Sequence, residues 1–136
     1  MKKTKLGEFE ELVLLTVAAL HASNGVLIPV EATRLSVAGL HQMTATIDEI
    51  AREHRDRHLK LQAIIPCRTH LRRRIHGDIM LQLENAYPGL IAPLVRENAA
   101  LAEAPAYGRP IITFASSSNG ASDYRAVAEW IDNHVR

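Results

Sequence analysis

The feature that most constrains this chain is a short apolar run, residues 26–30, with the sequence Val-Leu-Ile-Pro-Val. Its apolar residues do not alternate with polar ones, a pattern typical of a strand that is buried on both faces of a parallel sheet. A polar stretch, residues 31–36, follows, and a helical pattern begins at Val37. In such sheets, ligands bind beyond the carboxyl ends of the strands. We therefore expect Pro29, Glu31, Ala32 and Thr33 to lie at a functional edge, unless Pro29 simply ends the strand and Ser36 simply caps the helix.

The rest of the chain alternates between helical and extended patterns. Apolar residues at helical spacing predict helices over residues 8–22, 37–54, 73–86 and 120–135, and apolar runs predict further strands over residues 59–66 and 90–95. Pro93 would suit an edge or the end of a strand better than the centre of a sheet. A helical turn near residues 98–104 and an extended piece over residues 111–114 complete the prediction. The alternation predicts an α/β fold, with helices on the faces of a small parallel sheet.

Composition argues for one soluble domain spanning residues 1–136. The hydrophobic content of 47% is enough for a single core, and 16 Lys and Arg against 15 Asp and Glu give no global argument for nucleic acid. The single cysteine, Cys67, excludes an internal disulfide and a multi-cysteine zinc site. No apolar run approaches the ~18–20 residues that cross a bilayer, and no signal-peptide pattern opens the chain. We expect a cytoplasmic protein without membrane association.

Several separate motifs occur in a recognisable order. Residues 101–111 have the sequence Leu-Ala-Glu-Ala-Pro-Ala-Tyr-Gly-Arg-Pro-Ile, and Ser117-Ser-Asn-Gly-Ala121 and then Tyr124, Ala128 and Glu129 follow. Together with residues 14–20, 25–32 and 36–40, these motifs resemble the C-terminal half of ParA/MinD-type partition ATPases, the deviant Walker-A proteins. The resemblance covers about residues 14–131. It implies a truncated three-layer, P-loop NTPase-like fold.

The catalytic motifs of that family do not occur in this sequence. No Gly-rich loop followed by Lys-Thr or Lys-Ser is found, and the matching region begins after the Walker B aspartate. Phosphoryl transfer depends on these groups to position phosphate and Mg²⁺, so we do not expect the chain to hydrolyse ATP by itself. ATP and Mg²⁺ are implied only by the resemblance. The family's Thr-x-x-Asp-x-Arg pattern falls on residues 67–72 and keeps only Arg72, and its Ile-Pro pair near the nucleotide base falls on Val95 and Arg96.

The start of the chain carries a second resemblance. Residues 1–20 are similar to the opening helix of PadR-type winged-helix regulators, but the wing and recognition-helix pattern does not follow. We interpret residues 1–22 as a leading helix that is foreign to the ParA-like part.

The densest basic cluster comprises Arg68, Arg72, Arg73 and Arg74, with His70 and His76 beside it. Clustered cations at a helix start suit a phosphate. The resemblance implies sequence-independent DNA binding, for which Arg72, Arg73 and Arg74 are the candidates. A solvated helix start is the alternative.

The resemblance also places four residues near a nucleotide: Pro29, Glu31, Arg96 and Glu103. In residues 103–110, we expect Glu103 and Tyr107 to anchor a loop whose turn needs Gly108, with Pro110 leading into Ile111. In the family this loop borders the nucleotide and a partner-facing surface, so Glu103 and Arg109 could also be contact residues.

The remaining chemistry-bearing residues do not form a motif. His54 and His58 have the i, i+4 spacing that a metal can bridge, but the sequence places no third ligand, and we expect no metal site. Cys67 has no His or Asp partner fixed by a motif, so a strand-end thiol is favoured over a nucleophile.

The function that the resemblance implies is chromosome or plasmid partition. A dimer is expected because a truncated sheet leaves an edge and an apolar face uncovered. Nonspecific nucleoid DNA and a ParB-like adaptor are the implied partners. A small PadR-like DNA-binding regulator and a remnant without a selected role are the alternatives.

Overall fold

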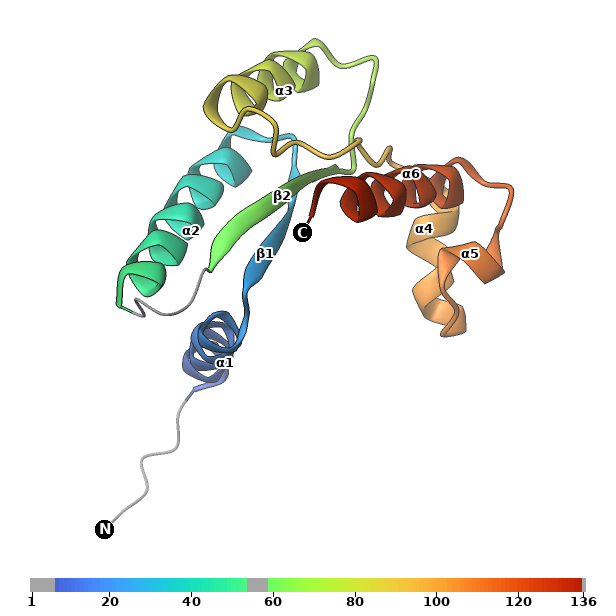
Figure 1. Cartoon of the computed structure of the whole chain (residues 1–136). Helices are drawn as coiled ribbons and strands as arrows, with labels where there is room; N and C mark the ends of the chain where they lie inside the picture. The colour runs from blue at the N-terminus through green and yellow to red at the C-terminus, as the bar shows by residue number, and fades with distance from the viewer. Residues whose placement is uncertain (1–6, 54–58, 136) are drawn as a thin grey trace.

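The computed structural model describes residues 7–53 and 59–135 and has the α/β architecture expected from the sequence (Figure 1). Its elements, in chain order, are α1 (Glu8–Ala22), β1 (Gly25–Glu31), α2 (Arg34–Glu53), β2 (Lys60–Cys67), α3 (Arg74–Ala86), α4 (Ala99–Glu103), the 3₁₀ turn η1 (Ala104–Tyr107), α5 (Ile111–Phe114) and α6 (Asn119–His134). No described helix is long and apolar enough to span a membrane.

The sheet has two parallel strands, β1 and β2, whose register pairs Ile28 with Ile64 and Glu31 with Cys67. The register shifts once, between Val26 and Leu27. Because the strands are parallel, both end at the same edge. The residues after each strand therefore lie close together there, at the edge where the sequence analysis expects a functional site.

The prediction of a third continuous strand over residues 90–95 is wrong. The segment is extended and runs parallel to β2, but it forms two isolated bridges and no continuous ladder: Ile64–Ile91, within β2, and Thr69–Arg96, two residues after β2 ends. Ile64 donates its N–H to the Leu90 carbonyl at 2.7 Å, and Val95 donates to the Pro66 carbonyl at 2.7 Å. Pro66 and Pro93 have no N–H to donate, so the ladder is interrupted between these contacts.

The prediction that β1 is buried on both faces is also wrong. On one face Val30 is buried, and it packs in a core with Leu40 of α2, Ile64 of β2, and Ile79 and Leu83 of α3. On the other face Leu27 is 41% exposed, and Pro29 and Glu31 are exposed too. The unbroken apolar run hid this difference, since a half-buried strand can also carry apolar residues on its open face.

The residue that caps α2 differs from the alternative considered from the sequence, which was Ser36. The helix begins at Arg34, three residues before the predicted start, because Thr33 caps it: Ser36 donates its N–H to Thr33 Oγ1 at 3.1 Å, and Val37 donates to the Thr33 carbonyl at 3.1 Å. Ser36 is therefore the donor to the cap and does not cap the helix itself.

The extended piece predicted over Ile111–Phe114 is a single helical turn, α5. Phe114 donates its N–H to the Pro110 carbonyl at 2.9 Å, and Ala115 donates to the Ile111 carbonyl at 2.9 Å. The β-branched sequence Ile-Ile-Thr favours a strand locally, but within residues 7–53 and 59–135 no strand lies alongside to pair with it. Instead Phe114 stacks on Tyr107 of η1, with 5.1 Å between ring centroids.

The C-terminal motifs have visible structural roles. Gly108 has φ 60°, the left-handed conformation that glycine adopts without strain, so the predicted turn is confirmed. Ser118 caps α6 by accepting a hydrogen bond from the Ala121 N–H at 3.1 Å. Gly120 lies against Leu101, and a Cβ there would come within 2.6 Å of Leu101 Cγ. Figure 1 shows the result, with α4, α5 and α6 grouped on one side of the strands and α2 on the other.

Candidate functional site

A chain of ion pairs links the carboxyl ends of the strands. Arg68 follows β2 and donates from Nη1 to Glu31 Oε1 at the end of β1, at 2.9 Å, and its Nη2 lies 3.6 Å from Glu97 Oε1. His70 Nε2 also contacts the Glu97 carboxylate. The backbone of Arg68 has φ 49°, which is uncommon for a residue other than glycine. Exposed pairs of this kind contribute only about 0–1 kcal/mol each, so their main effect is to neutralise the charges at this edge.

A second ion pair, between Arg96 and Asp123, connects the extended segment of residues 90–96 to α6. Arg96 donates its backbone N–H and Nε to Asp123 Oδ2, both at 3.0 Å, and Nη2 to Oδ1 at 2.8 Å. The side-chain hydrogen bond from Arg96 is the main reason why the pKa of Asp123 lies below its ordinary value. The same bond and the charge of Asp123 raise the pKa of Arg96. Arg96 thus acts as a structural clamp, a role that the sequence did not indicate.

Between these pairs lies a pocket of about 260 Å³. Its lining combines apolar and polar side chains from β2, the extended segment, α4 and α6: Cys67, Arg68, Val95, Arg96, Glu97, Asn98, Leu101, Ala102 and Tyr124. Burial, and then the negative charge of Glu31, raise the pKa of Cys67. Burial, and then Cys67, raise the pKa of Tyr124. A thiol that keeps its proton is a poor nucleophile, which supports the strand-end interpretation of Cys67.

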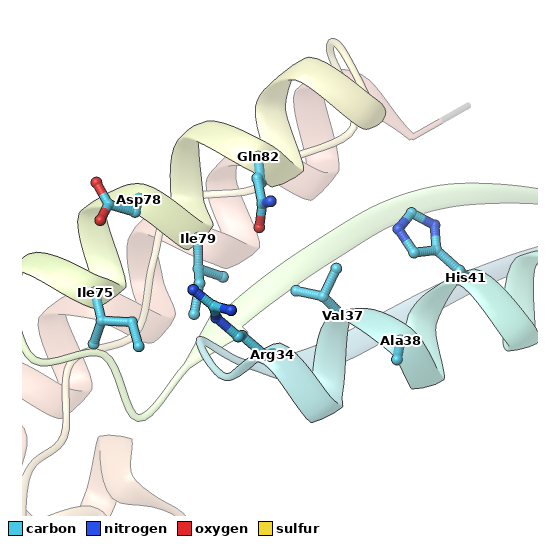
Figure 2. Close-up of a pocket in the computed structure, with 8 residues that line it drawn as sticks. All are labelled: Arg34, Val37, Ala38, His41, Ile75, Asp78, Ile79 and Gln82. Atoms are coloured by element: carbon cyan, nitrogen blue, oxygen red, sulfur yellow. The ribbon is translucent and has the colours of Figure 1, made fainter.

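A larger groove, of about 480 Å³, runs between α2 and α3 (Figure 2). Its walls are Arg34, Val37, Ala38 and His41 from α2 and Ile75, Asp78, Ile79 and Gln82 from α3. Figure 2 shows Arg34 reaching from α2 toward Ile79 of α3. At the other end of the α2 wall, His41 Nδ1 and the Tyr87 hydroxyl are hydrogen-bonded at 2.7 Å.

The arginines of the described residues fall into two groups. Five donate to the protein itself: Arg52, Arg109 and Arg125 to backbone carbonyls, and Arg68 and Arg96 to carboxylates. The other four are exposed, and their side chains have no hydrogen bond or ion pair within the described structure: Arg34, Arg72, Arg73 and Arg74. Three of these belong to the basic cluster seen in the sequence, whose fourth arginine, Arg68, is paired with Glu31. Arg34 was missed because it is isolated in sequence, and only the parallel strands bring its helix start to the same edge.

The four residues expected near a nucleotide do not line one pocket. Pro29 and Glu31 line a pocket of about 350 Å³ along β1 and α2. Arg96 lines the pocket beside Cys67, and Glu103, at the end of α4, is exposed and lines neither of them. His54 and His58 lie outside the described residues. Among the residues that are described, no group of three or more His, Cys, Asp or Glu side chains could hold a metal ion.

Comparison with known proteins relates this chain to a family. A family model described as an AAA domain matches residues 10–61. The chromosome partitioning protein ParA of Myxococcus xanthus is 31% identical over 117 residues, which is 85% of this chain and 41% of that protein. The chromosome-partitioning ATPase Soj of Thermus thermophilus is 32% identical over 126 residues, which is 90% of this chain and 49% of that protein. This chain is a relative of the ParA/MinD-type partition ATPases.

An uncharacterised protein of Pseudomonas putida is 32% identical over 118 residues, or 86% of this chain and 44% of that protein. The chain therefore spans less than half the length of the ParA relatives that it matches. The family match begins at residue 10, within α1. Most of that helix thus lies inside ParA-like sequence, which gives no support to a foreign origin for all of residues 1–22.

Proposed function

We propose that the chain is a DNA-binding part of a chromosome or plasmid partition system and that it does not hydrolyse ATP by itself. The observation that carries this proposal is the set of unpaired arginines, Arg72, Arg73 and Arg74, on a relative of proteins named for chromosome partition. Because no acceptor among the described residues holds their guanidinium groups, these side chains are available to phosphates. DNA is the expected ligand, bound without sequence preference.

The position of the three arginines supports a phosphate ligand. They occupy the two residues before α3 and its first residue, and the first turn of α3 contains no acidic residue. The partial positive charge of the helix start therefore adds to the side-chain charges. Three neighbouring cations repel one another, and a polyanion relieves that repulsion.

A bound nucleotide, if the chain takes one, would border Pro29, Glu31, Arg96 and Glu103. Two of these already have partners, since Glu31 pairs with Arg68 and Arg96 with Asp123. A nucleotide would have to compete with those pairs, and this sequence contains no Gly-rich loop to hold its phosphates. We therefore propose that ATP and Mg²⁺ are not resident cofactors of this chain.

The proposed assembly is a homodimer, acting on nucleoid DNA in the cytoplasm with a ParB-like adaptor. Self-association is supported by the open face of β1, where Leu27 is 41% exposed, and by α1, where Leu12 and Leu15 are 62% and 68% exposed. Apolar side chains gathered in this way favour contact with a second surface. We further propose that residues 1–136 act as one domain led by α1.

The test of the DNA proposal is fluorescence anisotropy with two unrelated duplexes of about 30 base pairs, over a series of KCl concentrations. We expect similar affinities for both sequences and a steep loss of affinity with salt. Replacing Arg72, Arg73 and Arg74 together with Ala should reduce the magnitude of the slope of log K against log salt by about 3, because each lost phosphate contact removes about 0.9. An unchanged affinity in the triple variant would refute the assignment, and a strong preference for one duplex would favour a sequence-specific regulator.

A titration of the wild-type chain with a fluorescent ATP analogue and Mg²⁺ tests the cofactor proposal. We expect no saturable rise in anisotropy up to millimolar nucleotide. Saturable binding that unlabelled ATP reverses would contradict it.

A further inference from the structure

Arg34 belongs with the arginines whose side chains lack a partner in the described structure, although Arg72 is 38 positions further along the chain. It is the first residue of α2, while Arg74 is the first residue of α3. Each helix begins shortly after a strand of the same parallel pair, so both starts lie beyond the same edge of the sheet. The four unpaired arginines of the described chain are thus all at this one edge.

The two helix starts share an unusual charge pattern. Acidic side chains are favoured in the first turn of a helix, where they offset its partial positive charge. Neither α2 nor α3 has an acidic residue in its first turn. Each helix start instead combines its own partial charge with arginine side chains that no carboxylate of the described residues neutralises, an arrangement that favours an external anion.

The groove between the helices connects the two sets of arginines. Arg34 and Ile75 line the same groove, and Arg74 immediately precedes Ile75 in α3 (Figure 2). Asp78, one turn further along α3, lines it as well. Phosphates near the groove would therefore be attracted by Arg34 from the α2 wall and by Arg74, which lies beside the groove residue Ile75 at the start of α3, and Asp78 would repel them.

We infer that Arg34 joins Arg72, Arg73 and Arg74 in a single cationic surface, built on two helices across the α2–α3 groove, that binds the phosphate backbone of nucleic acid. This inference rests on the proposed function and assigns a further contact residue to the same site. It also makes Asp78 a residue that limits affinity.

The experiment is the same salt titration with duplex DNA, applied to Arg34→Ala. Loss of one phosphate contact should lower the slope by about 0.9, which corresponds to about fivefold weaker binding at 0.15 M salt. Arg34→Lys should keep most of the affinity, because it keeps the charge. Arg52→Ala is the matched control, an exposed arginine in the last turn of the same helix whose guanidinium donates to the Asp48 carbonyl, and it should bind like the wild type.

Asp78→Asn gives a test that a folding defect cannot mimic, because it should strengthen binding by about two- to fivefold as one repulsive charge disappears. An unchanged or weaker affinity would overturn the role of the groove. If the triple arginine variant loses binding while Arg34→Ala does not, the inference is wrong and the proposed function stands. If neither variant loses binding, both fail.

Discussion

Asp123, the fifth residue of α6, accepts three hydrogen bonds from Arg96, a residue 27 positions earlier in the chain. The pair includes the backbone N–H of Arg96, so it fixes the path of the extended segment as well as the position of a side chain. This relationship holds the C-terminal helices against the end of the sheet, and its strength depends on the charge of one carboxylate.

The first prediction concerns this pair and pH. The pKa of Asp123 is lower in the folded state than its ordinary value, so the ionised carboxylate stabilises the fold above an ordinary pKa of about 3.9. This contribution is lost as the pH falls through the folded pKa. We expect Asp123→Asn to lower Tm most at pH 7, and the difference from the wild type to shrink below about pH 4. Asp132→Asn, at an exposed position of the same helix, is the control for thermal unfolding, and a pH-independent difference would contradict the prediction.

The second prediction compares two glycines. Gly120→Ala should cost about 1–3 kcal/mol of unfolding free energy, because its Cβ would press on Leu101 and force a shift in the packing. Gly77→Ala, in α3, should stabilise the protein by about 0.5–1 kcal/mol, since its Cβ meets nothing within 4 Å and alanine favours a helix. Urea unfolding at equilibrium measures both. Equal effects of the two substitutions would show that α4 and α6 do not pack as described.

The third prediction identifies the cap of α2. Thr33→Ala removes the oxygen that accepts the Ser36 N–H and should cost about 1 kcal/mol. Ser36→Ala keeps that N–H and should cost clearly less. The comparison requires only urea unfolding of the two variants. A larger loss for Ser36→Ala would restore the cap that the sequence suggested.

The fourth prediction concerns the thiol. Because burial and then Glu31 raise the pKa of Cys67, its thiolate fraction at pH 8 is below that of a free cysteine, and alkylation by iodoacetamide should be slower than that of glutathione. Glu31→Gln removes the second cause and should speed the reaction. Mass spectrometry of timed samples gives the rates, and a Cys67 faster than glutathione would contradict the expected environment.

The sequence predicted the elements whose signals are local. The helix over residues 8–22 and the order of strands and helices follow from apolar spacing, and Gly108 follows from turn chemistry. The errors arose where distant partners decide the outcome. Residues 90–95 could not be recognised as a broken strand, because Pro66 and Pro93 interrupt the same ladder from two chain segments. Residues 111–114 have a β-branched sequence typical of a strand, and the local sequence does not reveal whether another strand is available to pair with it.

The candidate site was only partly visible for the same reason. Arg72, Arg73 and Arg74 are adjacent in sequence and were found, whereas Arg34 becomes their neighbour only through the parallel pairing of β1 and β2. Composition also gave no indication of which arginines already have a protein partner. That distinction, between Arg96 and Arg74 for example, depends on Asp123 being folded back against the extended segment.

The packing of Gly120 against Leu101 shows what the sequence resemblance to the family reflects in this chain. The glycine and its neighbours belong to the motifs that made the resemblance visible, and their work here is mechanical, since they let two helices approach closely. Such residues can keep a sequence recognisable while the groups that perform chemistry change or disappear. In this chain, the resemblance to the family reflects how the helices pack. Its activity has to be inferred separately, from the arginine side chains that have no partner in the described structure.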